Sequence, residues 1–395
     1  MANSNEKRVL LLIETSRGFG RNLFQGIQRF VMENRNWTVF FQDRGLLEGT
    51  ADWIKKWNGD GILSRTSNLL LYRQLREKNI PMLELLGDGN KIPGNILCDE
   101  NDVGSVAAKH LLSCGLRNFA YFTSENTYWS RMASMEFENV LNRHGFECLR
   151  YPHQRKSNCG YAPLAVLEES RDMICEWLIS LPKPIGLFAA TDLHAMYVLS
   201  AARSANLMVP EEIAILGNDN DQLLCQVVIP QLSSVDQNSQ NIGYLAAKTL
   251  DWMMKGEPAP TKCTYVSGAE VVVRQSTDVL AITDTDVAAA IRLIRRRFSD
   301  PTLSVPQIAA HLNLSRRTLE RRFQESFHRS PETEIVRVRI EFAKTLLRDT
   351  RLSASTVALR SGFGSSEYFF RVFKRITGMT PNQFRLNNQS VAKVQ

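Results

Sequence analysis

The sequence contains no run of apolar residues approaching the ~18 that a membrane-spanning helix requires. Residues 1–8 form a largely polar tail, and the apolar run 9–13 that follows is too short for the core of a signal peptide. The seven cysteines show no C-x-x-C spacing and no cluster with histidine of the kind that binds zinc. We therefore expect a cytoplasmic protein that contacts no membrane, with reduced and mostly buried thiols, no metal and no cofactor.

Motifs that would indicate an enzyme are absent as well. The sequence has no phosphate-binding loop of the G-x-x-x-x-G-K-[ST] type and no G-x-S-x-G nucleophile elbow. Gly18 and Gly20 follow an apolar run, but Leu23 occupies the position of the third glycine of a Rossmann fingerprint. Because no set of nucleophile, base or metal ligands is visible, we expect no catalytic activity.

Charge is distributed unevenly along the 395 residues, whose formal net charge is +7. Residues 284–395 contain 20 lysines and arginines against 10 aspartates and glutamates, whereas the first 283 residues contain 28 against 31. A near-neutral body followed by a basic segment is typical of a protein that binds nucleic acid. The length predicts two or three domains.

The first 280 residues alternate between short apolar runs and amphipathic segments. Such alternation predicts parallel sheets covered by helices on both faces, and about 270 residues favours two subdomains around a cleft. The predicted strands are Val9–Glu14, Thr38–Gln42, Gly61–Ser64, Met82–Leu86, Phe119–Thr123, Ile185–Ala190 and Ala214–Leu216. The predicted helices include Gly20–Asn34, Val103–Ser113, Ala133–Arg143, Met173–Ser180 and Ile242–Lys255.

Three blocks of this region resemble the ligand-binding core of the LacI/GalR repressors and the periplasmic sugar-binding proteins. They are 99–115, with Gly104, Ala107 and Ala108; Ala214-Ile-Leu-Gly217-Asn-Asp219; and 232–247, with Asp236 and Gly243. The resemblance implies a two-subdomain, periplasmic-binding-protein-like α/β core over residues 9–276. Repressors of that family begin with a DNA-binding helix-turn-helix, whereas this sequence begins directly with the first predicted strand.

Ligands of open α/β sheets bind beyond the carboxyl ends of the strands, so polar and aromatic residues at those ends are the candidate ligand contacts. They are Arg17, Trp129, Arg131, Asp192 and Asp219. Sugars are held by carboxylates, amides and guanidinium groups, with an aromatic ring against their apolar face. Asp192 could equally cap the following helix, and Trp129 could be ordinary core.

The same resemblance implies that Asp219 is the sugar-binding aspartate of the family. The arginine of the family comes about two residues after Arg131, where this sequence has Ala133. This departure leaves another pentose or a polyol open as the ligand.

In the basic segment, a pattern recurs after about 50 residues. Its copies are 303–323, anchored by Leu319 and Phe323, and 352–373, anchored by Phe369 and Phe373. Each copy reads as a short helix, a tight turn and a second helix, and the apolar spacing within 332–348 predicts a connecting helix. This is the pattern of two helix-turn-helix units that reach the major groove of DNA.

The second copy resembles the signature of the AraC/XylS transcription regulators. It has Gly362-Phe363, then Tyr368-Phe369, Phe373-Lys374, Gly378, Thr380-Pro381 and Phe384-Arg385 at the spacing of that family. The resemblance implies an all-α DNA-binding domain over 288–386, joined to the core by a linker at 277–287 and followed by a tail at 387–395.

Helical geometry points Arg317, Arg321 and Gln324 away from the core if Leu319 and Phe323 face it. Together with the resemblance, this predicts the DNA contacts as Arg316, Arg317, Glu320, Arg321 and Gln324 in the first unit and Ser366, Glu367, Tyr368, Arg371 and Lys374 in the second. Arginine can bind guanine through two hydrogen bonds, whereas Arg316, Arg322 and Lys374 are better placed for phosphates. Basic residues on helix faces can also be solvated surface, as for Arg295–Arg297.

A sugar-type core ahead of an AraC-type domain is the arrangement of the activators of xylose operons, which this sequence resembles from end to end. That resemblance implies a homodimer that binds D-xylose, double-stranded operator DNA and RNA polymerase. Two rival classes remain: a periplasmic sugar carrier, which would need an export signal, and a sugar-modifying enzyme, which would need a catalytic constellation.

Overall fold

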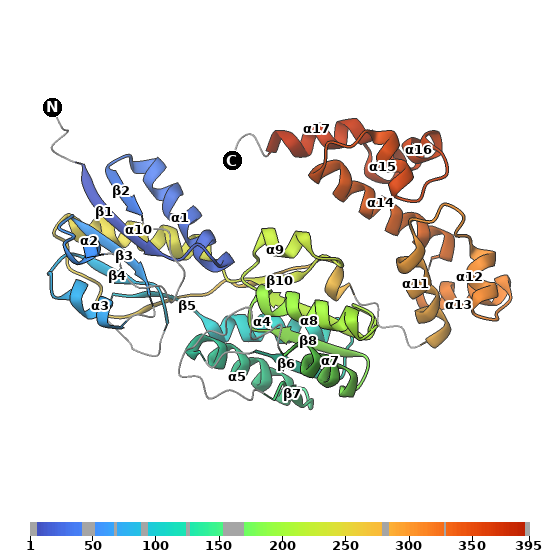
Figure 1. The fold of residues 1–395 in the computed structure, drawn as a ribbon, viewed down its shortest axis with the longest axis horizontal. Coiled ribbons are helices and arrows are strands. Elements are labelled where there is room, and N and C mark those ends of the chain that lie inside the picture. The colour runs from blue at the N-terminus through green and yellow to red at the C-terminus, as the bar shows by residue number, and fades with distance from the viewer. Residues whose placement is uncertain are drawn as a thin grey trace. The chain divides into compact units, whose positions relative to one another are not determined.

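The structure is a computed structural model of the chain, and it describes residues 6–41, 52–66, 69–87, 94–123, 127–152, 170–278, 284–327 and 329–391. The chain forms two compact units, Met1–Leu280 and Ala281–Gln395. Figure 1 shows the first unit as two α/β subdomains and the second as helices only. Within the described ranges, no helix is long and apolar enough to cross a bilayer.

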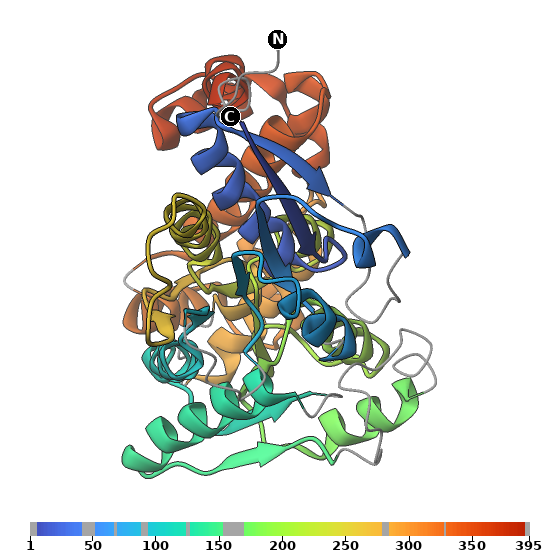
Figure 2. The same cartoon turned by 90° about the vertical axis from the view of Figure 1, so that its left-hand side faces the viewer.

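The first subdomain contains a parallel sheet in the order β2-β1-β3-β4. Successive residues of β1 face opposite sides of the sheet. Val9 and Leu11 pack with α1 and α10, whereas Leu10 and Leu12 pack with α2 and α3. Helices α1 and α10 lie side by side (Figures 1 and 2). The elements are β1 (Lys7–Ile13), α1 (Gly18–Asn34), β2 (Trp37–Phe41), α2 (Asp52–Lys55), β3 (Gly61–Arg65), α3 (Leu69–Arg76), β4 (Met82–Glu84) and α10 (Ser239–Met254).

The second subdomain contains a six-stranded sheet in the order β12-β10-β9-β8-β6-β7, parallel except for the β10–β12 pair. Phe119 and Tyr121 of β6 pack toward α4 and α5, whereas Ala120 and Phe122 pack toward α7 and α8. The elements are α4 (Glu100–Ser113), β6 (Phe119–Phe122), α5 (Tyr128–Arg143), β7 (Cys148–Arg150), α7 (Arg171–Ser180), β8 (Ile185–Ala189), α8 (Asp192–Ser204), β9 (Ile213–Asn218), α9 (Gln222–Val227), β10 (Ser233–Asp236) and β12 (Glu270–Val272).

The chain passes between the two subdomains three times: between β4 and α4, between β10 and α10, and between α10 and β12. Two of these crossings pair with each other, because β5 (Ile96–Cys98) runs parallel to β11 (Thr264–Val266). After the last crossing, a 3₁₀ turn at Gln275–Thr277 ends the described part of the first unit.

The second unit consists of two helix-turn-helix pairs, α12–α13 and α15–α16, joined by α14. Ile340, Ala343 and Leu347 of α14 pack with Phe369 and Phe373 of α16 in one buried cluster. Serine side chains cap several helices: Ser315 Oγ accepts the Thr318 N–H, and Ser365 Oγ accepts the Tyr368 N–H. The helices are α11 (Thr285–Arg297), α12 (Val305–His311), α13 (Arg316–Phe327), α14 (Pro331–Asp349), α15 (Ala354–Arg360), α16 (Ser366–Thr377) and α17 (Pro381–Val391).

The predicted fold class is confirmed: a two-subdomain α/β core is followed by an all-α domain with two helix-turn-helix units. Each of the seven predicted strands is present, and it differs from its predicted range by one to three residues in total. Gln42, the last residue of one predicted strand, lies outside the described residues. Sequence reasoning missed strands of three or four residues, such as β5 and β11, because so few residues carry no periodic pattern.

Some predicted boundaries need correction. The predicted linker 277–287 began at Thr277, which is buried and hydrogen-bonded in the core, and it ended inside α11, which Asp284 caps. The predicted tail 387–395 began inside α17, and the predicted tail 1–8 overlaps β1. Residues 279–283 and 392–395 lie outside the described residues.

Candidate ligand cavity and DNA-reading helices

A cavity of about 390 Å³ lies between the two subdomains of the first unit. This volume falls within the range of small-molecule sites. Its walls come from both subdomains, for example from Phe19 and Arg65 on one side and from Trp129 and Asp219 on the other. Tyr265, which lies in β11, adds a residue from a crossing segment.

Several helices begin at the cavity, as the parallel sheets require. Arg17 directly precedes α1, Asp99 caps α4, Thr191 caps α8, and Trp129 lies in the first turn of α5; all four line the cavity. The Asp99 carboxylate accepts the Asn101 N–H at 3.2 Å, and this cap fixes the start of α4. The strand-helix turns therefore place polar side chains around one space.

The cavity lining combines charged, amide and aromatic side chains. The charged residues are Arg17, Arg65, Asp99, Glu100 and Asp219, and the neutral polar residues include Asn101, Thr191 and Gln237. The aromatic residues are Phe19, Tyr128, Trp129 and Tyr265. Carboxylates and guanidinium groups form charge-assisted hydrogen bonds, and aromatic faces cover apolar surface, so this lining suits a ligand with many hydroxyl groups.

Three lining residues carry buried polar atoms that have no hydrogen-bond partner among the described residues. They are Arg65 Nε, Glu100 Oε2 and Trp129 Nε1. Leaving such an atom unpaired costs about 1–3 kcal/mol, and more for a charged group. Two donors and one acceptor around one cavity therefore indicate a polar ligand that offers both acceptors and donors.

The carboxylates of the cavity are held in a dry environment. Burial raises the pKa of Glu100 to about 8, despite the nearby Arg65 charge. Burial, followed by repulsion from Asp192, raises the pKa of Asp219 well above its usual range, while Arg17 and Arg65 act in the opposite direction. Arg65 forms a buried ion pair with Glu14, and its guanidinium lies 4.6 Å from the centre of the Phe19 ring.

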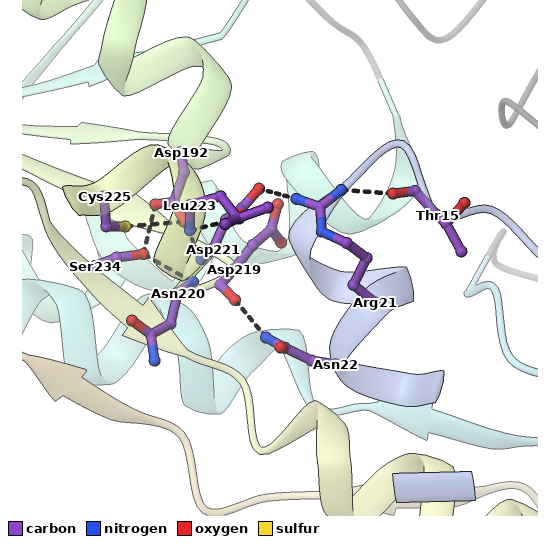
Figure 3. Close-up of polar contacts among 10 residues, drawn as sticks. All are labelled: Thr15, Arg21, Asn22, Asp192, Asp219, Asn220, Asp221, Leu223, Cys225 and Ser234. Atoms are coloured by element: carbon purple, nitrogen blue, oxygen red, sulfur yellow. Dashed lines mark hydrogen bonds and ion pairs between the residues drawn. The ribbon is translucent and has the colours of Figure 1, made fainter. Parts of the chain in front are cut away.

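Asp219 begins a tightly held loop, Asp219–Asp221 (Figure 3). Its φ of 112° lies in the left-handed region, and φ of Asn220 is 45°. The Asp219 N–H donates to the Val235 carbonyl at 3.0 Å, and Asp219 Oδ1 accepts from Gln237 Nε2 at 3.1 Å. Strained backbone of this kind persists only where surrounding contacts hold it, and it clusters at functional sites.

The same loop contacts helix α1 of the other subdomain. Arg21 forms an ion pair with Asp221, and Asn22 Nδ2 donates to the Asp219 carbonyl at 3.1 Å (Figure 3). Gly18 is needed at the start of α1, since a Cβ there would lie 2.6 Å from Asp221 Cβ. The loop therefore bridges the two subdomains, and its first residue, Asp219, lines the cavity.

The structure places three of the five predicted ligand contacts, Arg17, Trp129 and Asp219, in the cavity lining. Arg131 is not in the lining: it is exposed on α5, two residues and about 200° around the helix from Trp129. The family position of the arginine, Ala133, packs its backbone against Gly104 of α4.

Asp192 is also outside the lining, so its predicted ligand contact needs correction. It is buried, and it accepts the Asp221 N–H at 2.6 Å and the hydroxyl of Ser234. Burial raises the pKa of Asp192 to about 7. Thr191, not Asp192, caps α8, so the carboxylate braces the Asp219–Asp221 loop from behind (Figure 3).

Sequence reasoning missed Arg65, Glu100 and Gln237 as cavity residues. Arg65 is the last residue of β3 and directly follows the predicted strand Gly61–Ser64, so the strand-end rule was the signal that could have found it. Glu100 directly follows Asp99, the cap of α4, within the block 99–115 that resembles the LacI/GalR core. No sequence signal identifies Gln237, which lies on a crossing segment.

Of the described residues, no group of three or more His, Cys, Asp and Glu is arranged to hold a metal ion. Six of the cysteines are free thiols, and Cys159 lies outside the described residues.

In the second unit, α13 and α16 are the second helices of the two helix-turn-helix pairs, and we call them the reading helices because the predicted DNA contacts lie on them. The first reading helix is α13. Leu319 and Phe323 are fully buried, and Arg316, Arg317, Arg321 and Gln324 are exposed, while Glu320 is half-buried. The exposed pairs Arg316–Glu320 and Arg321–Glu325 have N–O distances of 2.8 and 2.7 Å. Surface pairs of this kind contribute little stability, so DNA can displace the glutamates at small cost.

Arg322 was expected to contact phosphate, but it has a structural role in this unit. Its guanidinium forms ion pairs with Asp284 and Asp286 at the start of α11. The side chain of Arg317, by contrast, makes no hydrogen bond or ion pair with any described residue. Among the arginines of α13, Arg317 is therefore the most available for DNA.

The second reading helix is α16. Phe369 and Phe373 are fully buried, whereas Glu367, Tyr368, Arg371 and Lys374 are exposed and Ser366 is half-buried. The Arg371 guanidinium lies 5.6 Å from the centre of the Tyr368 ring. All ten predicted DNA contacts therefore lie on α13 or α16 with their side chains at least partly exposed; their contact with DNA stays a prediction.

Comparison with protein families supports this division. A periplasmic binding protein-like domain matches residues 108–277, and a helix-turn-helix domain matches residues 308–387. The fold and these domains define a DNA-binding transcription regulator with a ligand-binding core and an AraC-type reading domain.

Over nearly its whole length, the chain resembles the xylose operon regulatory proteins. It is 28% identical to that of Haemophilus influenzae, covering 96% of this chain and 98% of the relative, and 25% identical to that of Escherichia coli K12, covering 97% and 98%. A solved structure of the xylose-binding transcription activator XylR superimposes with a TM-score of 0.79 at 24% identity, covering 98% of this chain and 99% of that one. The chain is a sugar-responsive, DNA-binding transcription regulator.

Proposed function

We propose that this chain is a D-xylose-dependent activator of sugar-catabolism genes. A pentose binds in the cavity between the subdomains of the first unit, and its binding alters how the second unit binds operator DNA. The main support for a sugar ligand is that three buried polar atoms around one cavity have no partner among the described residues: Arg65 Nε, Glu100 Oε2 and Trp129 Nε1. The names of the full-length relatives support xylose as the effector.

Five residues of the cavity lining bind the sugar through polar groups in this proposal. Asp219 and Glu100 accept hydrogen bonds from sugar hydroxyls, and Arg17 and Arg65 donate to hydroxyl or ring oxygens. Trp129 donates through Nε1, while the aromatic residues cover the C–H faces of the ring. A hydroxyl bound to a charged group contributes roughly 1.5–3 kcal/mol, so a few such bonds suffice for micromolar affinity.

On the DNA side, we propose that Arg317, Glu320 and Arg321 contact bases from α13. Ser366, Glu367, Tyr368 and Arg371 have the same role on α16. Arg316 and Lys374 contact phosphates, and Gln324 is available to either. The excess of basic residues in 284–395 supplies sequence-independent attraction to the duplex.

Activation further implies partners beyond the effector. We propose a cytoplasmic homodimer that places its reading units on paired half-sites and contacts RNA polymerase. The relative described as a transcription activator supports activation over repression. Sedimentation of the full chain with and without xylose tests the dimer.

Thermal denaturation with a panel of pentoses, hexoses and polyols tests the effector. A ligand at 100 times its Kd stabilises the folded state by about 2.7 kcal/mol, which raises Tm by roughly 4–5 °C for a unit of this size. We expect xylose to give the largest shift and calorimetry to confirm one site per chain. A larger shift with another pentose or a polyol, consistent with Ala133 at the arginine position of the family, would replace xylose as the effector.

A further inference from the structure

The Asp219–Asp221 loop also contacts the segment that leads to the DNA-binding unit, through its middle residue. Asn220 Oδ1 accepts a hydrogen bond from Arg274 Nη2 at 2.8 Å. The Asn220 amide in turn donates to Asp236 Oδ2 at 3.0 Å, and the Asn220 N–H donates to Ser234 Oγ at 3.0 Å. Asn220 is therefore held through its side chain by Arg274 and Asp236, and through its backbone by Ser234. Of these three partners, only Arg274 lies beyond β12.

Arg274 is joined to the body of the second sheet as well as to this loop. Its Nη1 donates to the Leu232 carbonyl at 2.8 Å, and its backbone N–H donates to Ser233 Oγ at 2.8 Å. The Arg274 guanidinium therefore links Asn220, in the loop after β9, to Leu232, which directly precedes β10. Because the guanidinium fork is rigid, a shift of Asn220 must either break one of these bonds or move Arg274.

The residues that follow Arg274 carry the chain out of the first unit. Ser276 Oγ donates to the Ile215 carbonyl at 2.6 Å, and Thr277 Oγ1 hydrogen-bonds with His110 Nε2 at 2.8 Å. Helix α11 of the DNA-binding unit begins only eight residues later, at Thr285. The position and order of the 3₁₀ turn at Gln275–Thr277 therefore determine where the linker starts.

We propose that Arg274 is the positioning residue that transmits ligand occupancy from the cavity to the linker. This inference rests on the proposed function, since it needs a ligand on Asp219. A hydroxyl bound by the Asp219 carboxylate draws this side chain toward the ligand, and the adjacent Asn220 then changes its hydrogen bond with Arg274. The guanidinium passes this change to the 3₁₀ turn, and the coupling free energy between sugar and DNA depends on it.

The test measures sugar affinity and DNA affinity separately in the full chain. Arg274→Met removes the guanidinium, and Asn220→Gly removes its acceptor while accepting the left-handed φ. Arg203→Met, at an exposed position near the end of α8, is the matched control. D-xylose affinity is measured by calorimetry, and DNA affinity by fluorescence anisotropy on a duplex that the wild-type chain selects from a random library.

In the wild-type and Arg203→Met chains, we expect saturating xylose to change DNA affinity by roughly 5–150-fold. In the Arg274→Met and Asn220→Gly chains, we expect this ratio to fall below about 3-fold, with xylose affinity and sugar-free DNA affinity within about 3-fold of wild type. Hydrogen exchange of 275–290 should respond to xylose in the wild-type chain and not in these two variants. A merely structural role for Arg274 would lower the melting temperature and leave the ratio unchanged.

The inference is overturned if both variants bind xylose and keep the wild-type ratio. If Arg274→Met does not fold, the Asn220→Gly chain decides the question alone. A wild-type chain whose DNA affinity ignores bound xylose would instead refute the proposed function, so the two failures are distinguishable.

Discussion

Asp219→Asn changes one oxygen of the cavity lining into an amide nitrogen and leaves the size of the side chain almost unchanged. Asparagine also tolerates the left-handed backbone of this position, whose φ is 112°. Alanine would add backbone strain to the loss of the carboxylate, so its effect on binding would be harder to interpret. In the asparagine variant, the remaining oxygen can still accept the bond from Gln237.

The expected loss of sugar affinity follows from the bonds that the carboxylate can make. Oδ1 is engaged by Gln237, and Oδ2 accepts no bond from the described residues, so it is available to a sugar hydroxyl. A hydrogen bond to a charged acceptor contributes about 1.5–3 kcal/mol, and the new amide presents a donor where an acceptor was needed. We expect xylose affinity to fall at least ~10-fold, or about 1.4 kcal/mol.

Folding should not suffer in the same variant. Burial and repulsion from Asp192 raise the pKa of Asp219, so removing its charge relieves a cost in the folded state. We expect an unchanged or higher melting temperature in the absence of sugar. The matched change Asp192→Asn, behind the loop and outside the cavity lining, should show the opposite: a lost buried hydrogen bond, about 1–3 kcal/mol less stability and nearly wild-type xylose affinity.

Calorimetry for affinity and thermal denaturation for stability, on both variants, complete this test. A stable Asp219→Asn chain that binds xylose like wild type would remove Asp219 from the site. A chain that loses stability instead would show that the carboxylate braces the turn after β9.

Three further predictions concern other parts of the chain. Arg321→Ala should weaken DNA binding by about 1–3 kcal/mol and relax the preference at one base pair, whereas Lys374→Ala should weaken all duplexes alike; equal losses on every single-base variant with Arg321→Ala would exclude base reading. Burial raises the pKa of Glu84 from 4.5 to about 8, so the folded state retains a proton that the unfolded state loses, and the free energy of unfolding should fall with rising pH between these values by at most ~1.4 kcal/mol per unit. Glu84→Gln should flatten that slope in urea titrations from pH 5 to 8, and an unchanged slope would assign it to other groups. Gly362→Ala should destabilise the DNA-binding unit by more than ~1 kcal/mol, because φ is 80° and the new Cβ would lie 2.1 Å from the Phe298 carbonyl oxygen; wild-type DNA affinity and melting would contradict this.

The sequence predicted the parts of the fold that periodicity determines. Buried strands such as Ile185–Ala189 are continuous apolar runs, and reading-helix faces follow from residues four apart, such as Leu319 and Phe323. The same rules found Asp219 and Arg17 at the cavity, because parallel strands bring their carboxyl ends together.

What the sequence could not predict depends on contacts between distant segments. Whether a strand-end carboxylate faces the cavity or lies behind a loop is set by its partners, and the partners of Asp192 are at positions 221 and 234. Gln237 reaches the cavity from the crossing between β10 and α10, and Tyr265 reaches it from β11, whose path is set by its pairing with β5. The two ion pairs of Arg322 join it to Asp286 and Asp284, which precede it in the sequence by 36 and 38 positions.

We expect a sugar bound in the first unit to control DNA binding by the second unit of the same chain. The most direct measurement is fluorescence anisotropy of the full chain on its selected duplex, with and without D-xylose at a concentration that calorimetry shows to be saturating. We predict a change in DNA affinity of roughly 5–150-fold, and in Asp219→Asn the same change should need at least ~10-fold more xylose. Equal DNA affinity of the wild-type chain with and without bound xylose would show that the sugar does not control DNA binding.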